Sequence, residues 1–308
     1  MKRNDLCAKV RIPATTANCG PGFDTLGIAC TLYNEVSLEL NGPGNAVQIV
    51  VTGDGADTLP VNEKNLVLRS VRTVLDRANH PATNLRLTLH NNIPLSRGLG
   101  SSSAAIVGGL VAANSVVGNL FSRQELLSMA TKLEGHPDNV APALLGGFAV
   151  SVMQGERVTS LSLPVPAALK LVVCIPAFRL STNKARQAIP DIVPHRDAVF
   201  NVSRTALLVG AMASGRLEYL SEALDDKLHQ PYRAALIPGM AAVFAAGKAA
   251  GALGVAMSGA GPSLMAYTIE NADAVGNAMV HAFQVHDVQS RYLCLGVDYD
   301  GACIVDLA

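Results

Sequence analysis

The sequence predicts a protein of the α+β or α/β class that is divided into two domains. Strand-like segments, recognised by polar–apolar alternation or short apolar runs, take turns with segments of helical spacing along the whole chain. The chain has 308 residues, more than one hydrophobic core usually holds, and 49% of them are hydrophobic. We place the domain boundary near residue 165, where two prolines interrupt the pattern, which gives domains of residues 1–165 and 166–308.

The first half begins with a strand at residues 8–12, which alternates polar and apolar side chains. Residues 13–24 are full of turn formers and predict an irregular loop. Further strands are predicted at residues 26–40, 47–51 and 85–90 and after Gly147, and helices at residues 65–77, 101–117, 125–134 and 138–145. The helix at 101–117 is apolar on nearly every face, which predicts that it is buried.

The second half continues the alternation of strands and helices. Strands are predicted at residues 171–175, 254–257, 264–267, 292–297 and 302–305, and helices at residues 195–213, 238–250 and 272–283. No run of about 18 apolar residues occurs, so no membrane-spanning helix is predicted.

Charge and cysteine usage exclude several classes of function. Lys plus Arg and Asp plus Glu both number 24, so the chain lacks the basic excess that nucleic acids or anionic membranes attract. Residues 1–5 lead into a strand with Lys9 and Arg11, which interrupts the apolar stretch that a secretory signal needs. None of the six cysteines forms a C-x-x-C pair or a zinc pattern, so we expect a reduced, cytoplasmic protein.

Residues 98–105, Gly-Leu-Gly-Ser-Ser-Ser-Ala-Ala, lie between a predicted strand and the buried helix. Glycines allow a tight turn and close approach to a ligand, and serines can cap the helix or donate hydroxyls. A helix start also offers unpaired N–H groups and the positive end of the dipole. These features favour a phosphate-binding loop over the simpler alternative, an N-capped helix after a glycine turn.

Three familiar nucleotide sites do not fit this loop. A Walker loop needs Lys directly after its last glycine, and none follows here. A dinucleotide fingerprint needs a third glycine where Ser103 stands. The protein-kinase pattern is approached at His195, Arg196 and Asp197, but Asn201 comes one position too early and the segment is helical.

Residues 94–104 resemble the phosphate-binding motif of the GHMP kinases, a family of small-molecule kinases. Residues 13–27 resemble the N-terminal motif of that family and residues 254–263 its C-terminal motif, in the same order. The resemblance implies the α+β GHMP kinase fold, with an N-terminal domain like ribosomal protein S5 domain 2 and a ferredoxin-like C-terminal domain. It also implies ATP as cofactor, bound by Pro94, Leu95, Ser96, Arg97, Gly98, Leu99, Gly100, Ser101, Ser102, Ser103 and Ala104.

Within the family, residues 13–24 lack the basic residue and the G-E-H that mevalonate kinase and galactokinase usually carry. Together with residues 134–143 they are similar to the members that phosphorylate homoserine. This implies transfer of the ATP γ-phosphate to the hydroxyl of L-homoserine in threonine biosynthesis. A homodimer is a further expectation, because family members often dimerise.

Homoserine is a zwitterion with a hydroxyl, so its site needs a cation, an anion or carbonyl, and a polar group. Arg186 and Arg233 match the arginines of the family that bind the carboxylate, which a guanidinium can grip with two hydrogen bonds. We expect Asp24 to meet the amine and Asn18 the hydroxyl; the alternative is Asx-turn chemistry in a glycine-rich loop. Further substrate contacts are expected from His136, Asp138 and Thr182.

The remaining roles concern the phosphates. Asn139 is expected to stabilise the transferring phosphoryl group, and Glu134 with the Ser102 hydroxyl to bind Mg²⁺. Phosphoryl transfer has a loose transition state, so positioning and charge neutralisation carry most of the catalysis. We therefore expect Asn18 and Asp24, with Asp138, to orient the hydroxyl, and we assign no general base. The alternatives are a GHMP kinase with another hydroxylated substrate, and a non-catalytic ligand-binding protein of this fold.

Overall fold

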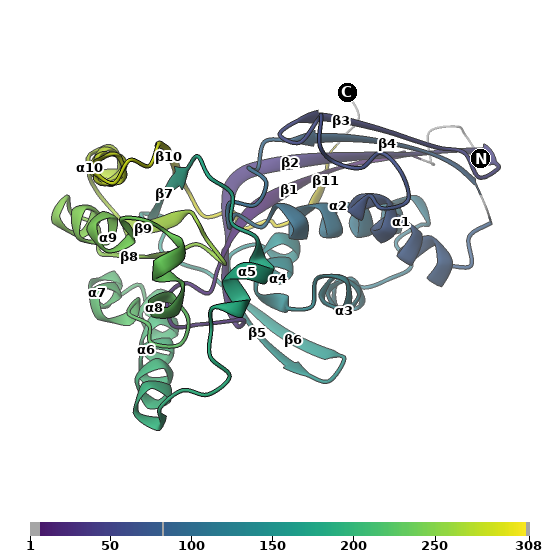
Figure 1. Cartoon of the computed structure of the whole chain (residues 1–308). Helices are drawn as coiled ribbons and strands as arrows, with labels where there is room; N and C mark the ends of the chain where they lie inside the picture. Colours follow the sequence, from purple (N-terminus) through teal and green to yellow (C-terminus); the bar gives the residue numbers. More distant parts are fainter. Residues whose placement is uncertain (1–6, 82, 306–308) are drawn as a thin grey trace.

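The computed structural model describes residues 7–81 and 83–305. Residues 1–5, which were considered above as the start of a secretory signal, lie outside the described residues. Its strands form two sheets (Figure 1). The first has the order β11-β1-β2-β4-β3, with β5 paired to β2 and β6 paired to β5. Its strands are β1 (Cys7–Ala17), β2 (Leu26–Pro43), β3 (Val47–Gly53), β4 (Thr83–Asn91), β5 (Phe148–Gln154), β6 (Arg157–Leu163) and β11 (Cys303–Val305).

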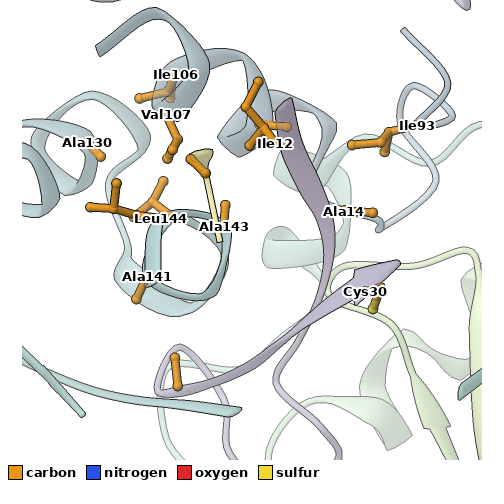
Figure 2. Packing of buried hydrophobic residues seen from close by; sticks show 14 of the residues in the cluster. Ile12, Ala14, Cys30, Ile93, Ile106, Val107, Ala130, Ala141, Ala143 and Leu144 are labelled. Atoms are coloured by element: carbon orange, nitrogen blue, oxygen red, sulfur yellow. The ribbon is translucent and has the colours of Figure 1, made fainter. Parts of the chain in front are cut away.

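Four helices accompany the first sheet: α1 (Leu66–Arg77), α2 (Ser101–Val116), α3 (Arg123–Glu134) and α4 (Pro137–Leu145). Helix α2 lies in their middle, in contact with β1, β2 and each of the other three. The main core is built from side chains of these elements and of the loop after β4, which contributes Ile93. Figure 2 labels Ile12, Ala14, Cys30, Ile93, Ile106, Val107, Ala130, Ala141, Ala143 and Leu144 of this core. The burial predicted for α2 is confirmed, because its surroundings are protein on nearly every side.

The second sheet contains β7 (Lys170–Pro176), β8 (Gly254–Met257), β9 (Leu264–Thr268) and β10 (Ser290–Leu295), in the order β10-β7-β9-β8. Helix α9 (Met240–Ala249) packs against β8 and β9, and α10 (Ala272–Val285) against β7 and β10. The β-α-β-β-α-β succession is ferredoxin-like, as predicted. The link from β7 to α9 also holds α5 (Thr182–Gln187), α6 (His195–Ser214), α7 (Leu220–Ala223) and α8 (Gln230–Arg233).

The class is α+β, because every strand pair of the described chain is antiparallel except β3 with β4. The chain passes from the first sheet to the second between Leu163 and Lys170. The domain boundary near residue 165 falls in this passage and stays a prediction. Strand β11 lies beyond that boundary in sequence, yet it pairs with β1 and so belongs to the first sheet.

Several segments differ from their predictions, among them the short helices α5, α7 and α8, which were not predicted. The irregular loop expected at residues 13–24 is shorter, because β1 continues to Ala17 in pairing with β2. A register shift between Pro13 and Ala14 accommodates the proline, which lacks the N–H that a regular ladder needs. Strand β6 was not predicted; it forms a hairpin with β5 around Gly155, whose φ is 60°.

In the described ranges, none of the helices has both the length and the apolar character to cross a bilayer. Cys19, Cys30, Cys174, Cys294 and Cys303 are free thiols.

Candidate active site

A pocket of about 670 Å³ lies between the two sheets. It receives the loop after β1, the loop before α2, the start of α4, helix α5 and the end of α8. The predicted site residues that line it are Asn18, Asp24, Pro94, Leu95, Ser96, Arg97, Gly98, Leu99, Gly100, Ser101, Ser102, Glu134, His136, Asp138, Asn139, Thr182, Arg186 and Arg233. Two predicted residues do not line it: Ala104 is fully buried in the core, and Ser103 faces Glu134 from within the protein.

The predicted phosphate loop has an unusual backbone, with positive φ at Ser96, Gly98 and Gly100. A Cβ at Gly98 would lie 2.1 Å from the carbonyl oxygen of Ser258 in the C-terminal motif, residues 254–263. A Cβ at Gly100 would lie 1.9 Å from Oγ1 of Thr15 in the N-terminal motif, residues 13–27, called the first motif below. Glycine is required at both positions because no side chain fits there.

Helix α2 begins after Gly100, which serves as its N-cap without any side-chain hydrogen bond. The sequence suggested that the serines could cap the helix. Instead, Gly100 is the N-cap and the serines form the first turn. The first amides of a helix have no partner within the helix. Among the residues that the structure describes, no side chain caps this helix start, so its first amides are available to an anion in the pocket.

Glu134, the last residue of α3, points at this helix start. Its Oε1 accepts hydrogen bonds from Oγ of Ser102 (2.7 Å) and from Oγ of Ser103 (2.9 Å). Gly135, with a φ of 97°, is the C-cap that ends α3 directly after Glu134. The structure thus brings together the two residues predicted to bind a metal.

The side-chain amide of Asn18 joins the first-motif loop to the C-terminal motif. Its Oδ1 accepts from the backbone N–H of Asp24 (3.0 Å), and its Nδ2 donates to the carbonyl of Gly259 (2.8 Å). Both Asn18 and Asp24 have positive φ, which short polar side chains tolerate. The turn chemistry weighed as the alternative is therefore present, in a loop that also faces the pocket.

Asp24 and Arg186 form an ion pair across the pocket. Nη1 and Nη2 of Arg186 donate to the two carboxylate oxygens at 2.9 and 2.7 Å. This hydrogen-bonded pairing with Asp24 raises the pKa of Arg186. The ring of Phe23 lies between the two predicted carboxylate-binding arginines, 5.5 Å from the guanidinium of Arg186 and 5.3 Å from that of Arg233.

Arg233 is buried, and protein atoms hold its guanidinium in place. Nε donates to the carbonyl of Ala185 (3.0 Å), and Nη1 lies 3.2 Å from Nδ1 of His229 and 3.3 Å from the carbonyl of Gly259. Burial lowers the pKa of Arg233 to about 10, helped by the like charge of Arg186. The guanidinium therefore stays charged at neutral pH.

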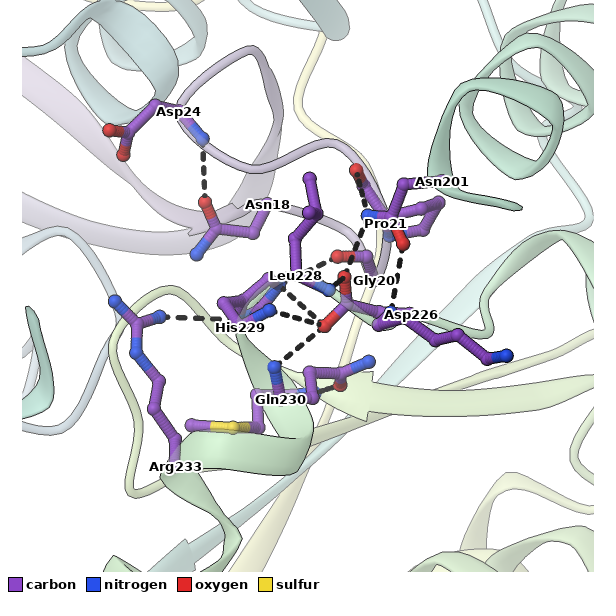
Figure 3. Close-up of polar contacts among 12 residues, drawn as sticks. Asn18, Gly20, Pro21, Asp24, Asn201, Asp226, Leu228, His229, Gln230 and Arg233 are labelled. Atoms are coloured by element: carbon purple, nitrogen blue, oxygen red, sulfur yellow. Dashed lines mark hydrogen bonds and ion pairs between the residues drawn. The ribbon is translucent and has the colours of Figure 1, made fainter. Parts of the chain in front are cut away.

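His229 links Arg233 to the first-motif loop (Figure 3). Its Nε2 lies 2.7 Å from the carbonyl oxygen of Gly20, and its ring stacks on Phe23 with centroids 5.3 Å apart. Because Arg233 can only donate, Nδ1 of His229 accepts and Nε2 carries the hydrogen given to Gly20. Burial lowers the pKa of His229, which keeps the ring neutral in this tautomer.

Asp226 fixes the segment that carries His229. Its carboxylate accepts from the backbone N–H groups of Leu228, His229 and Gln230 and from Nδ2 of Asn201 (Figure 3). Asn201 also donates to the carbonyl of Pro21, so α6, α8 and the first-motif loop are joined in one buried network. Sequence reasoning missed this network, since its members are spread over two hundred residues without a shared motif.

The start of α4 contributes further polar side chains to the pocket, His136 and Asp138. Nδ1 of His136 makes a hydrogen bond to Oδ1 of the buried Asp138. Burial alone would lower the pKa of His136, but this hydrogen bond and the negative charges of Asp138 and Glu134 raise it. Ligand atoms of Asp24, His136 and Asp138 lie within 4.8 Å of one another. Beside them, Oδ1 of Asn139 accepts from Oγ1 of Thr15 (2.8 Å).

The other end of the pocket is mainly apolar. Its lining includes Leu59, Pro60, Leu66, Val67 and Leu89, with Lys64 and Asn65 at the start of α1. Arg179, from the loop after β7, also reaches the pocket. No motif marks these residues, and sequence reasoning missed them because they lie in segments of ordinary composition.

Comparisons with known proteins agree on one family. The model of the GHMP kinases N terminal domain matches residues 65–147, and that of the GHMP kinases C terminal domain matches residues 208–284. The homoserine kinase of Moorella thermoacetica is 46% identical over 96% of this chain and 99% of its own. That of Carboxydothermus hydrogenoformans is 48% identical over 95% of both chains. The crystal structure of homoserine kinase from Cytophaga hutchinsonii superposes with a TM-score of 0.91 at 32% identity, covering 99% of each chain.

Proposed function

This chain belongs to the homoserine kinases of the GHMP kinase family, and we propose that it transfers the γ-phosphoryl group of ATP to the side-chain hydroxyl of L-homoserine. The product is O-phospho-L-homoserine, an intermediate of threonine biosynthesis. The observation that carries the proposal is one pocket that joins a free helix start, suited to phosphate, to an acidic and basic pair, suited to a zwitterion.

The amino-acid end of the pocket matches the charges of homoserine. Asp24 and Arg186 neutralise each other through two hydrogen bonds, and Arg233 adds a fixed positive charge. A zwitterion can exchange this one ion pair for two, with its amine on Asp24 and its carboxylate on Arg186 and Arg233. Uncharged sugars offer no such exchange, which favours an amino-acid alcohol as the acceptor.

The nucleotide is proposed to lie along the rest of the pocket. The apolar stretch beside α1 suits an aromatic base, while the loop of Gly98 and Gly100 brings phosphate oxygens close to backbone N–H groups. This order places the terminal phosphate between the start of α2 and the polar residues at the start of α4. Thr182, at the start of α5, lines the same region and is proposed as a further substrate contact.

Glu134 and Ser102 would hold Mg²⁺, whose usual ligands are carboxylate, hydroxyl, phosphate and water oxygens. Oε1 of Glu134 already gathers two serine hydroxyls, and no hydrogen bond or ion pair to Oε2 is recorded within residues 7–81 and 83–305. When bound, the ion neutralises phosphate charge. The donor set therefore fits a magnesium ion that is shared with the nucleotide.

Catalysis in this proposal rests on position and charge. The helix start of α2 stabilises negative charge on the transferring group, and Asn139, held by Thr15, presents its amide to the same place. Asp24 and the rigid Asn18 orient the hydroxyl acceptor, while Asp138 is engaged by His136. A loose transition state needs little help from a base, so no general base is assigned.

The two alternatives are not favoured. A kinase for another hydroxylated substrate would not be expected to share 46–48% identity with homoserine kinases over nearly the whole chain. A non-catalytic ligand-binding protein would not need Glu134 and the serines in the arrangement described.

The test is a coupled assay of ADP release with purified protein, ATP and Mg²⁺. Homoserine, mevalonate, shikimate and several sugars are offered in turn. Release with homoserine alone supports the proposal. Release with another acceptor, and none with homoserine, would overturn it.

A further inference from the structure

We propose that a second pocket, of about 500 Å³, is a binding site for a phosphate dianion, either free or as the end group of a small monoester. The pocket lies on the other side of the phosphate loop from the acceptor site. The loop after β3, the loop before α2, the end of β7 and the start of β10 form its walls. No residue of the acceptor site lines it.

Three arginines face this pocket: Arg97 from the phosphate loop, Arg179 from the loop after β7, and Arg291 from β10. None of them forms an ion pair in the part of the chain that the structure describes. Asp54 is the single carboxylate of the lining, and its Oδ2 is engaged by the backbone N–H of Leu95 (2.6 Å). The pocket therefore carries a clear excess of positive charge in a protein whose formal net charge is zero.

Hydrogen bonds hold Arg97, the least exposed of the three arginines, in place at this pocket. Nη2 of Arg97 donates to the carbonyl of Ala177 (2.6 Å), and the N–H of Leu180 donates to the carbonyl of Ser96 (3.3 Å). These bonds pin the guanidinium of Arg97 beside the segment that carries Arg179. Burial lowers the pKa of Arg97, and the charge of Arg179 lowers it further, so the ionised form gains from an anion placed here.

Phosphate is the ligand class that suits such a site. Guanidinium groups match phosphate oxygens with paired hydrogen bonds, and several arginines on one cavity favour a dianion over a carboxylate. The volume admits a phosphate with a short organic tail. Arg97 and Arg179 also line the first pocket, so an anion here would share its wall with the nucleotide.

Arg291 offers the cleanest test, because it lines the second pocket and not the first. Calorimetric titration uses the whole protein with its nucleotide site saturated by a non-hydrolysable ATP analogue and Mg²⁺. One arm titrates inorganic phosphate and the other glycerol 3-phosphate. We expect one binding event in the wild type that weakens about tenfold or more in Arg291→Ala, because charge-assisted hydrogen bonds are lost. The arm with the tighter binding identifies the source of the phosphate.

The matched control is Arg196→Ala, which removes an exposed arginine of α6 from a weak pair with Asp197. It should bind the probes like the wild type. Homoserine phosphorylation without added phosphate should be unchanged in both variants, which separates this inference from the proposed function. Absence of binding to the nucleotide-saturated wild type, or equal affinity in Arg291→Ala, would refute the site.

Discussion

Arg186 donates two hydrogen bonds to Asp24, at 2.7 and 2.9 Å, although the two residues are 162 positions apart and come from opposite sides of the active-site pocket. The pair is partly exposed, with 37% and 34% of the two side chains accessible. It is therefore open to exchange with a charged substrate, whereas a fully buried pair would resist exchange.

Asp24→Asn should raise the KM for homoserine about 10- to 100-fold, because the substrate amine loses a charge-assisted hydrogen bond. The kcat should fall much less, since Asp24 binds and orients rather than accepting a proton. Steady-state kinetics at saturating ATP measure both constants, with the exposed carboxylate change Glu156→Gln as control. A collapse of kcat at unchanged KM would instead identify Asp24 as a base.

Glu134→Gln should weaken the response of the enzyme to Mg²⁺. The amide keeps an acceptor for the serine hydroxyls but loses the negative charge that favours a divalent cation. We expect the Mg²⁺ concentration for half-maximal activity to rise about tenfold, with little change in the KM for homoserine. An unchanged Mg²⁺ titration would remove Glu134 from the metal site.

Gly100→Ala should abolish ATP binding and destabilise the fold. The residue has a φ of 69°, and the new methyl group would collide with Oγ1 of Thr15. Gly155→Ala is the matched control, with a φ of 60° and no atom within 4 Å of its Cβ; it should cost only about 1–2 kcal/mol of backbone strain. Urea unfolding and nucleotide titration measure the two effects, and equal losses in both variants would contradict the close packing at Gly100.

His136 should stabilise the protein more in acid than in alkali. Its pKa is raised above the ordinary value of 6.5, so the folded state binds its proton more tightly than the unfolded state. The stabilisation is complete below the ordinary pKa and is lost as pH rises through the raised one. The free energy of unfolding lost in His136→Gln should accordingly shrink as the pH rises from below 6.5 through the raised pKa, which urea titrations at a series of pH values measure. A loss that grows with pH would show that the neutral ring is the stabilising form.

His229→Phe keeps a ring against Phe23 but removes the hydrogen bonds to Gly20 and Arg233. A loosened Arg233 should raise the KM for homoserine about tenfold with a smaller effect on kcat, because His229 positions a binding group without touching the reacting atoms. His281→Phe, on the surface of α10, is the control. Wild-type kinetics in His229→Phe would contradict this role and would show that the bonds to Ala185 and Gly259 are sufficient to position Arg233.

Much of this site could be predicted from local sequence. Ser102, Glu134 and the glycines belong to short motifs whose chemistry is readable without coordinates. The ferredoxin-like domain was implied by the resemblance of these motifs to a known family, whereas the alternation of strands and helices predicted only an α+β or α/β protein. The pairing of Asp24 with Arg186 was not predicted, although each residue was. That pairing depends on how the two sheets face each other, which local spacing does not encode.

The His229 network could not be predicted for a related reason. Asp226 and Asn201 look like ordinary polar residues of loops and helices, and only burial makes their hydrogen bonds obligatory. The extension of β1 through Pro13 was missed because turn-forming residues conceal a strand whose pairing comes from β2. In each case a distant partner decides the local structure.

The return of the chain to the first sheet restricts how the enzyme can open. After β10, the N–H of Gly296 donates to Oγ1 of Thr31, and Asp298 bonds to Ala29 and to Tyr33 before β11 joins β1. The ferredoxin-like part is thus connected to the first sheet at two places, before β7 and after β10. We expect these attachments to restrict wide opening of the pocket, so that the substrate enters after a small displacement that separates Asp24 from Arg186.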